Sequence, residues 1–249
     1  LGERGGTVSL EVAALRRDGF DGPIELAVEG LPEGVSATGL RIPAGQTRGQ
    51  ILLTAADTPA QGLASVRIVG RGAVDGRAIE RPCRLAGHCW PVRDGWGEIP
   101  FPRLLADVAV SAGGVEPAPL SLRTTGAGLA ATAPIVAKEG ATIEVPLELV
   151  KREEVQGATF QMRVIGPGVE GQPGFELDVA APKPLSIDLA KLKVPAGDHA
   201  FALVASAVTK HAGVPAPGQQ AAAPTDIAEI LVSAPIHVRV EPATEEKKP

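Results

Sequence analysis

The stretch IELAVEGLPEGV (residues 24–35) decides the fold class of this chain. Ile24, Leu26 and Val28 alternate with their neighbours at a period of two, which is the pattern of a half-buried β-strand, and the Pro and Gly that follow predict a turn. The same alternation recurs at Val8, Leu10 and Val12. No segment combines helical periodicity with helix caps. The sequence therefore predicts an all-β fold of short antiparallel strands, as in a β-sandwich.

Composition narrows the class of protein. The chain has 249 residues, 44% of them hydrophobic, which is enough for two domains with real cores. It has no run of eighteen apolar residues that could span a membrane. The net charge of −5, without a basic stripe, argues against nucleic acid as a partner. The abundance of Gly and the excess of Arg over Lys are typical of a GC-rich bacterial genome.

Three blocks of sequence recur in the same order and indicate two copies of one sandwich. Residues 9–12 (SLEV) match 142–145 (TIEV), 24–35 resemble 160–169 (FQMRVIGPGV), and 40–45 (LRIPAG) match 192–197 (LKVPAG). We expect a first domain over residues 1–114 and a second over 115–243.

Four segments complete this organisation. Gly113-Gly114 with the prolines that follow forms a short linker. Residues 103–110 are expected to be the closing strand of the first domain. Residues 210–225, rich in Ala, Pro, Gly and Gln, predict a long mobile loop, and residues 244–249 a charged tail.

A family resemblance rests on the run RRDGFDGPIEL (residues 16–26), followed by GLPEGV (30–35) and IPAG (42–45). These motifs resemble immunoglobulin-like modules of large exported bacterial proteins, of the kind found beside pre-peptidase C-terminal (PPC-type) domains. The resemblance covers residues 1 to about 120 and is only general after that. It implies two tandem immunoglobulin-like sandwiches in an extracytoplasmic setting (periplasmic, cell-surface or secreted), and it implies no catalytic residues.

The two cysteines, Cys83 and Cys89, lie in an unusual segment, residues 83–100. In an exported protein they predict a local disulfide. The alternatives are two buried reduced thiols or a zinc site, for which His88 is the one further ligand nearby.

Both tryptophans, Trp90 and Trp96, flank a turn in the same segment. If exposed, they could stack on a sugar or anchor a protein partner. The alternative, which we favour, is that they are buried at the base of the first sandwich or at the domain junction.

Other chemistry has little support in the sequence. Asp18 and Asp21 could begin a calcium site, but Asp-Gly pairs serve more often as turn residues. The four histidines are far apart, and no serine sits in a G-x-S-x-G motif. We expect no catalytic residue, no metal and no cofactor.

The expected function is that of a non-catalytic spacer or protein-interaction module of a larger protein. Alternatives are a carbohydrate-binding module that uses the two tryptophans, and an accessory domain of an exported hydrolase. The repeat alignment also predicts that the first domain lacks its opening strand. We therefore expect an open edge near residues 8–15 that takes a strand from a protein partner or from an upstream segment of the same polypeptide.

Overall fold

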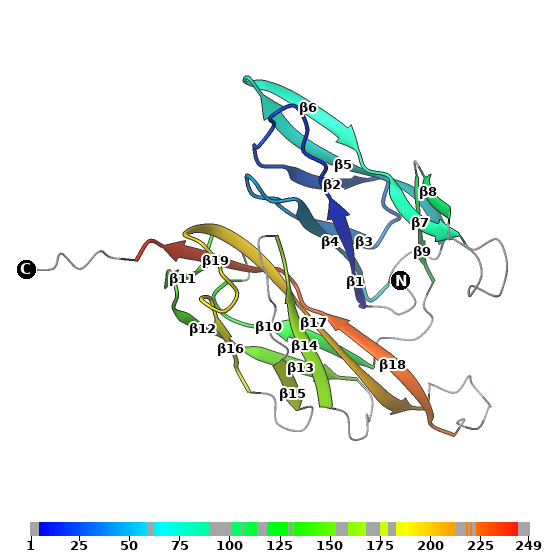
Figure 1. Ribbon diagram of the computed structural model, residues 1–249. Helices are drawn as coiled ribbons and strands as arrows, with labels where there is room; N and C mark the ends of the chain where they lie inside the picture. The colour runs from blue at the N-terminus through cyan, green and yellow to red at the C-terminus, as the bar shows by residue number, and fades with distance from the viewer. Residues whose placement is uncertain are drawn as a thin grey trace, which may run out of the picture.

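A computed structural model describes residues 5–58, 62–89, 101–105, 107–113, 119–128, 130, 132–152, 159–167, 175–178, 183–212, 218, 220 and 223–243. These residues form nineteen strands and no helix, so the all-β prediction is confirmed (Figure 1). Within them, no helical segment offers the length and apolarity needed to cross a membrane.

The strands of residues 5–113, the N-terminal half, form two sheets and a separate hairpin. One sheet has the order β1 (Thr7–Ala13), β4 (Arg48–Ala55), β3 (Val35–Leu40). In the other, β5 (Gly62–Val74) pairs with β2 (Glu25–Glu29), β6 (Arg77–Pro82) and β9 (Val108–Ala112). The hairpin consists of β7 (Leu85–Cys89) and β8 (Phe101–Leu105).

A core between the two sheets of the N-terminal half explains the alternation seen in the sequence. Val12 and Leu26 are buried there with Ile51, Leu53 and Val66. Because side chains on a strand alternate between its faces, the apolar residue at every second position faces this core.

The strands of residues 119–243, the C-terminal half, surround a second and larger core built around Phe160 and Phe201. On one side lie the pairs β10 (Leu120–Thr124) with β13 (Leu147–Lys151) and β12 (Thr142–Val145) with β16 (Leu185–Asp188). The other side is a sheet with the order β11 (Ile135–Lys138), β19 (Ile236–Glu241), β17 (Gly197–His211), β14 (Thr159–Ile165), β15 (Phe175–Asp178). β18 (Thr225–Val232) also pairs with β17, and the β11–β19 pairing is parallel.

Three expectations need correction. Residues 103–110 belong to two strands, because β8 pairs with β7 whereas β9 closes the N-terminal half by pairing with β5. The expected loop at 210–225 is shorter, because β17 and β18 are paired as far as Lys210↔Asp226 and His211↔Thr225. Most of its interior lies outside the described residues, so its mobility stays a prediction.

The third repeat block also occupies different places in the two halves. Residues 40–45 precede β4, which pairs with β1, whereas residues 192–197 follow β16, which pairs with β12. The first two blocks do fall on strands with matching partners. Residues 9–12 and 142–145 lie in β1 and β12, which pair with β4 and β16. The second block begins on β2 and β14, which pair with β5 and β17.

Candidate functional site

The two halves pack directly against each other, and this junction is the most developed site in the described part of the chain. Leu52 of β4 forms a buried cluster with Ile165, Ala202, Val204 and Val232 of the C-terminal half. Ile51 and Leu53 face the N-terminal core, so the side chain of Leu52 points out of the opposite face of β4. The outer face of one sheet therefore stacks on the outer face of another, which fixes the two halves by apolar burial.

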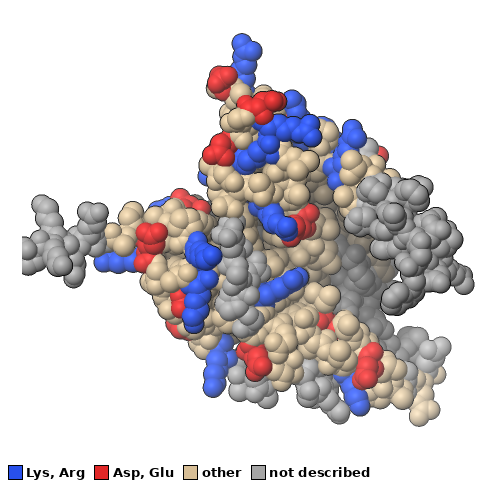
Figure 2. All heavy atoms as spheres, viewed as in Figure 1, with Lys and Arg blue, Asp and Glu red and all other residues tan. Residues whose placement is uncertain are grey.

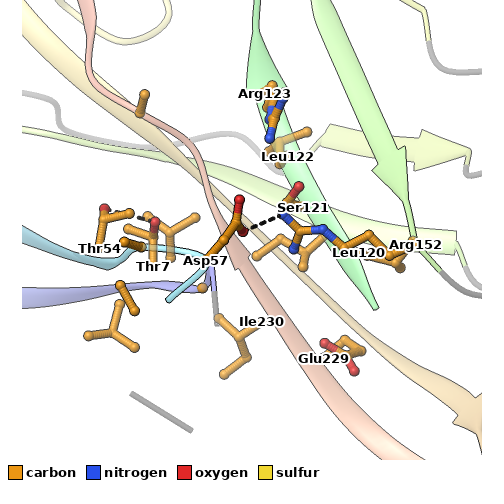
Figure 3. Close-up of a pocket in the computed structure, with 18 of the residues that line it drawn as sticks. Thr7, Thr54, Asp57, Leu120, Ser121, Leu122, Arg123, Arg152, Glu229 and Ile230 are labelled. Carbon is orange, nitrogen blue, oxygen red and sulfur yellow. Dashed lines mark hydrogen bonds and ion pairs between the residues drawn. The ribbon is translucent and has the colours of Figure 1, made fainter. Parts of the chain in front are cut away.

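Beside this cluster lies a cleft of about 560 Å³, lined by the start of β1, the end of β4, β10 and β18 (Figure 3). An ion pair joins the halves in this cleft, with Arg152 Nη2 3.2 Å from Asp57 Oδ1. The Arg152 side chain is 22% exposed and that of Asp57 is 78% exposed. Because one partner is largely in water, the pair orients the halves more than it stabilises them.

Gly5 lies against this ion pair, and replacing it with any other residue would distort the backbone or the ion pair. A Cβ at this position would lie 2.9 Å from Asp57 Oδ1 and 3.0 Å from Arg152 Nη2. Its φ of +71° is also a conformation that glycine adopts readily and other residues rarely. A side chain at position 5 would therefore push into the ion pair.

Hydroxyl groups and one buried carboxylate complete the polar lining. Thr7 and Thr54 share a hydrogen bond of 3.0 Å between their hydroxyls, and Glu229 is only 5% exposed. Ser121 Oγ is buried without a hydrogen-bond partner in the described residues. A nucleophilic serine needs a base within hydrogen-bond reach, and none of the described residues offers one to Ser121.

Charges of opposite sign are mixed on the described surface that faces the viewer in Figure 2. On the β2–β5–β6 sheet, Arg71 contacts Glu80 at 2.9 Å and Glu29 at 2.6 Å, and Arg67 contacts the same two carboxylates. The hydrogen bond from Arg71 lowers the pKa of Glu80 below its usual value. In these exposed pairs the charges of Arg67 and Arg71 are offset by those of Glu29 and Glu80.

The turn at Asp18 and Asp21 is organised by Arg16, which sequence analysis did not single out. The Arg16 guanidinium donates to the carbonyl oxygens of Gln46 (2.8 Å), Gly22 (2.6 Å) and Pro43 (2.8 Å), and it lies 5.3 Å from the centre of the Phe20 ring.

A cation at this turn would meet the Arg16 charge among the very carbonyls that could bind it. In the described part of the chain no group of three His, Cys, Asp or Glu side chains is arranged to hold a metal. The position of the Arg16 guanidinium is what favours the turn interpretation of Asp18 and Asp21.

Cys83 is a free thiol in the described part of the chain, whereas the side chain of Cys89 lies outside it, so the disulfide between them stays a prediction. The Cys83 side chain packs against the N-terminal core, its backbone N–H donates to Ile68, and burial raises the pKa of its thiol. β7 then extends from Leu85 to Cys89, and an extended strand of that length carries its far end about 13 Å away. A disulfide needs Cα atoms within about 7 Å, which a strand leading away from Cys83 does not favour.

The two tryptophans and several other predicted features lie outside the described residues. Trp90 and Trp96 are among them, so neither the sugar-stacking nor the buried interpretation is decided. The same holds for the expected linker at Gly114 and for the tail at 244–249, while the backbone of His88 and Cys89 is placed in β7 without a side-chain description.

The junction residues could have been found from one signal in the sequence. Ile51-Leu52-Leu53, Val164-Ile165 and residues 201–205 (FALVA) break the period-two alternation with consecutive apolar residues. Such runs indicate strands that are buried on both faces.

Comparison with protein-family models, with curated proteins and with solved structures finds no match for this chain.

Proposed function

We propose that this chain is a rigid pair of immunoglobulin-like modules with a structural and protein-interaction role in a larger protein outside the cytoplasm, and that it is not an enzyme. The N-terminal half supports the immunoglobulin-like assignment through its strand order. Its sheet β1-β4-β3 corresponds to strands B-E-D of an immunoglobulin constant-type sandwich. In its second sheet the pairing of β5 with β2 and β9 corresponds to C-F-G, while β6 also pairs with β5.

The pairing in the C-terminal half fits the same plan with the opening strand present. β12 and β13 together take the place of strand B, with β16 as strand E and β10 as strand A. β14, β17 and the β18–β19 pair take the places of C, F and G. β11, parallel to β19, fits an A′ strand beside G.

The junction is the observation that carries the structural role. A flexible pair of modules would leave the outer sheet faces polar and wet, whereas here Leu52, Ile165 and Val204 are each no more than 6% exposed. A fixed angle between modules is what a spacer needs in order to hold other domains at a set distance. The extracytoplasmic setting rests on the resemblance of residues 16–45 to modules of exported proteins.

Small-angle X-ray scattering tests this proposal. With the data extrapolated to zero concentration, a rigid pair gives a single compact distance distribution that matches the coordinates. The Leu52→Asp variant buries a carboxylate in the junction, so its radius of gyration should rise as the halves separate.

Gln50→Ser provides the control, because position 50 lies on the same face of β4 as Leu52 but outside the buried cluster. It should scatter like the unmodified chain. A broad distance distribution for the unmodified chain, equal to that of Leu52→Asp, would refute the rigid-spacer role.

A further inference from the structure

In the described part of the chain, β1 has no hydrogen-bonded strand on the side away from β4, although its start lies close to β18 at the cleft. In the described residues β1 pairs with β4 and with no other strand. Ala14 N–H donates to Thr47 at one end of this ladder, and Ala55 N–H donates to Gly6 at the other. Antiparallel strands alternate between hydrogen-bonded and non-bonded pairs, so the even-numbered residues of β1 bond to β4. The N–H and C=O groups of Thr7, Ser9, Glu11 and Ala13 consequently point away from β4, toward the open edge.

The edge of β1 lacks the features that usually keep an edge strand from pairing. Edge strands are normally protected by Lys, Pro, bulges or dense charge. β6 follows this rule with Arg77, Glu80, Arg81 and Pro82. β1 has the sequence TVSLEVA, with no Pro, Lys or Gly and with one charge, Glu11, which is already paired with Arg48.

The sequence of β1 is complementary to itself in one register. When two copies of β1 run antiparallel about a twofold axis through Leu10, Ser9 faces Glu11 of the other copy and Thr7 faces Ala13. All four are residues whose backbone groups point outward, so these pairs form about eight hydrogen bonds.

Side chains agree with the same register. Val8 then lies opposite Val12, and Leu10 opposite Leu10, on the face that continues the N-terminal core. A shift of the axis to Glu11 would place two carboxylates opposite each other, and a shift to Ser9 would draw Gly6 into the pairing. The Leu10 register is therefore favoured over both neighbours.

We propose that the partner of the β1 edge is a second copy of this chain, joined strand to strand through Thr7–Ala13. Two three-stranded sheets then become one continuous sheet. Val8, which is 40% exposed in the single chain, is covered by the second copy. This names the partner for the interaction role proposed above, but it does not depend on the junction being rigid.

Sedimentation velocity across concentrations of about 1 to 300 µM, the range suited to a small interface, tests the proposal. The unmodified chain should shift from monomer to dimer with rising concentration. Ser9→Pro removes an outward N–H without touching the β4 ladder and should weaken dimerisation about tenfold or more. Ser9→Ala keeps that N–H and should dimerise like the unmodified chain.

Val8→Lys serves as a second variant in case Ser9→Pro does not fold. It leaves the backbone intact and places a charge opposite Val12 of the other copy, so it should also weaken dimerisation. A monomeric unmodified chain over the whole range overturns the proposal, as does dimerisation of folded Ser9→Pro or Val8→Lys at the strength of the unmodified chain. Neither outcome alters the scattering test, because that test is extrapolated to zero concentration.

Discussion

At the scale of single residues, the conformation of the turn around Asp18 and Asp21 depends on one side chain, Arg16, which sequence patterns cannot identify. Asp18-Gly19 and Asp21-Gly22 predict a turn, and Asp18 does adopt a positive φ of 54° there. The sequence does not show that Arg16 reaches across to residues more than twenty positions away. Local patterns encode backbone preference, whereas such a contact depends on how the strands pack.

Replacing Arg16 should loosen this turn measurably. Arg16→Ala leaves three carbonyl oxygens without their charged donor, and we expect a loss of about 1 to 3 kcal/mol in the free energy of unfolding. Arg16→Lys should recover only part, because an ammonium cannot reproduce the planar fork of the guanidinium. Urea denaturation measures both. Arg17→Ala, at an exposed neighbour, should stay within about 0.5 kcal/mol of the unmodified chain, and an equal loss at both positions would contradict the role of Arg16.

Both cysteines should be present as thiols. Cys83 is a free thiol in the described part of the chain and packs against the N-terminal core, and the chain has two cysteines in all. Iodoacetamide under denaturing, non-reducing conditions should add two groups to the intact mass, whereas a disulfide would leave the mass unmodified.

In the folded protein, the raised pKa of Cys83 reduces its thiolate fraction at a given pH. Its reaction with a disulfide reagent near pH 8 should therefore be slower than in the unfolded chain. Equal rates for Cys83 in the folded and unfolded chain would show that burial does not control the thiol.

At the scale of elements, the exposed hairpin of β5 and β6 carries its charges in register with those of β2. In the strand register, Arg71 of β5 lies opposite Glu80 of β6 on one side and opposite Glu25 of β2 on the other. The Arg71 side chain also forms an ion pair with Glu29 of β2. Cross-strand pairs of opposite charge are the usual way to stabilise the wet face of a sheet. The sequence predicts a wet face here from its single scattered charges, but the pairing requires the register.

Glu80 should titrate below the usual glutamate pKa of about 4.3, because the hydrogen bond from Arg71 favours its charged form. The contribution of this pair to stability is therefore present above that unfolded-state pKa and is lost as the pH falls. NMR titration of the Glu80 carboxyl carbon measures the shift. Arg71→Gln should move the pKa back up, and no change in that variant would mean that Arg71 is not the cause.

Strand prediction was most informative where one face of a strand is buried. Alternation located the segments of β1 and β2, and the repeat located that of β12, because each of these strands has one core face. In the apolar runs 51–53 and 201–205, alternation alone does not indicate which side chains face the core of their own half and which face the opposite half of the chain. The division of residues 103–110 between β8 and β9 was also missed, because both pieces are apolar and only their partners differ.

At the scale of the whole molecule, the junction determines how the two halves behave together. Each half has its own core, and Leu52 with its four partners forms a third cluster between them. The sequence repeat predicts two units, yet it carries no information on their contact. The repeat reflects what the two units have in common, whereas the contact joins a face of one unit to a different face of the other. Residues of the third cluster should therefore affect coupling between the halves more than the stability of either.

Substitution of Val204 should separate the unfolding of the two halves. Val204 is 6% exposed and faces the junction, while Phe201, Leu203 and Ala205 of the same strand face or pack in the C-terminal core. Val204→Asp places a carboxylate in an apolar contact, which costs several kcal/mol unless the contact opens to water. Opening the junction relieves that cost without disturbing either core, so the halves should come apart while both remain folded.

Differential scanning calorimetry measures this effect against a matched control. Val208→Asp makes the same substitution on the same face of β17, where the side chain is 67% exposed, and should leave the thermogram close to that of the unmodified chain. Val204→Asp should instead split or broaden the transition, with the N-terminal half melting earlier because it loses the cover over Leu52. Indistinguishable thermograms for the two variants would mean that the halves unfold independently already and that the third cluster does not couple them.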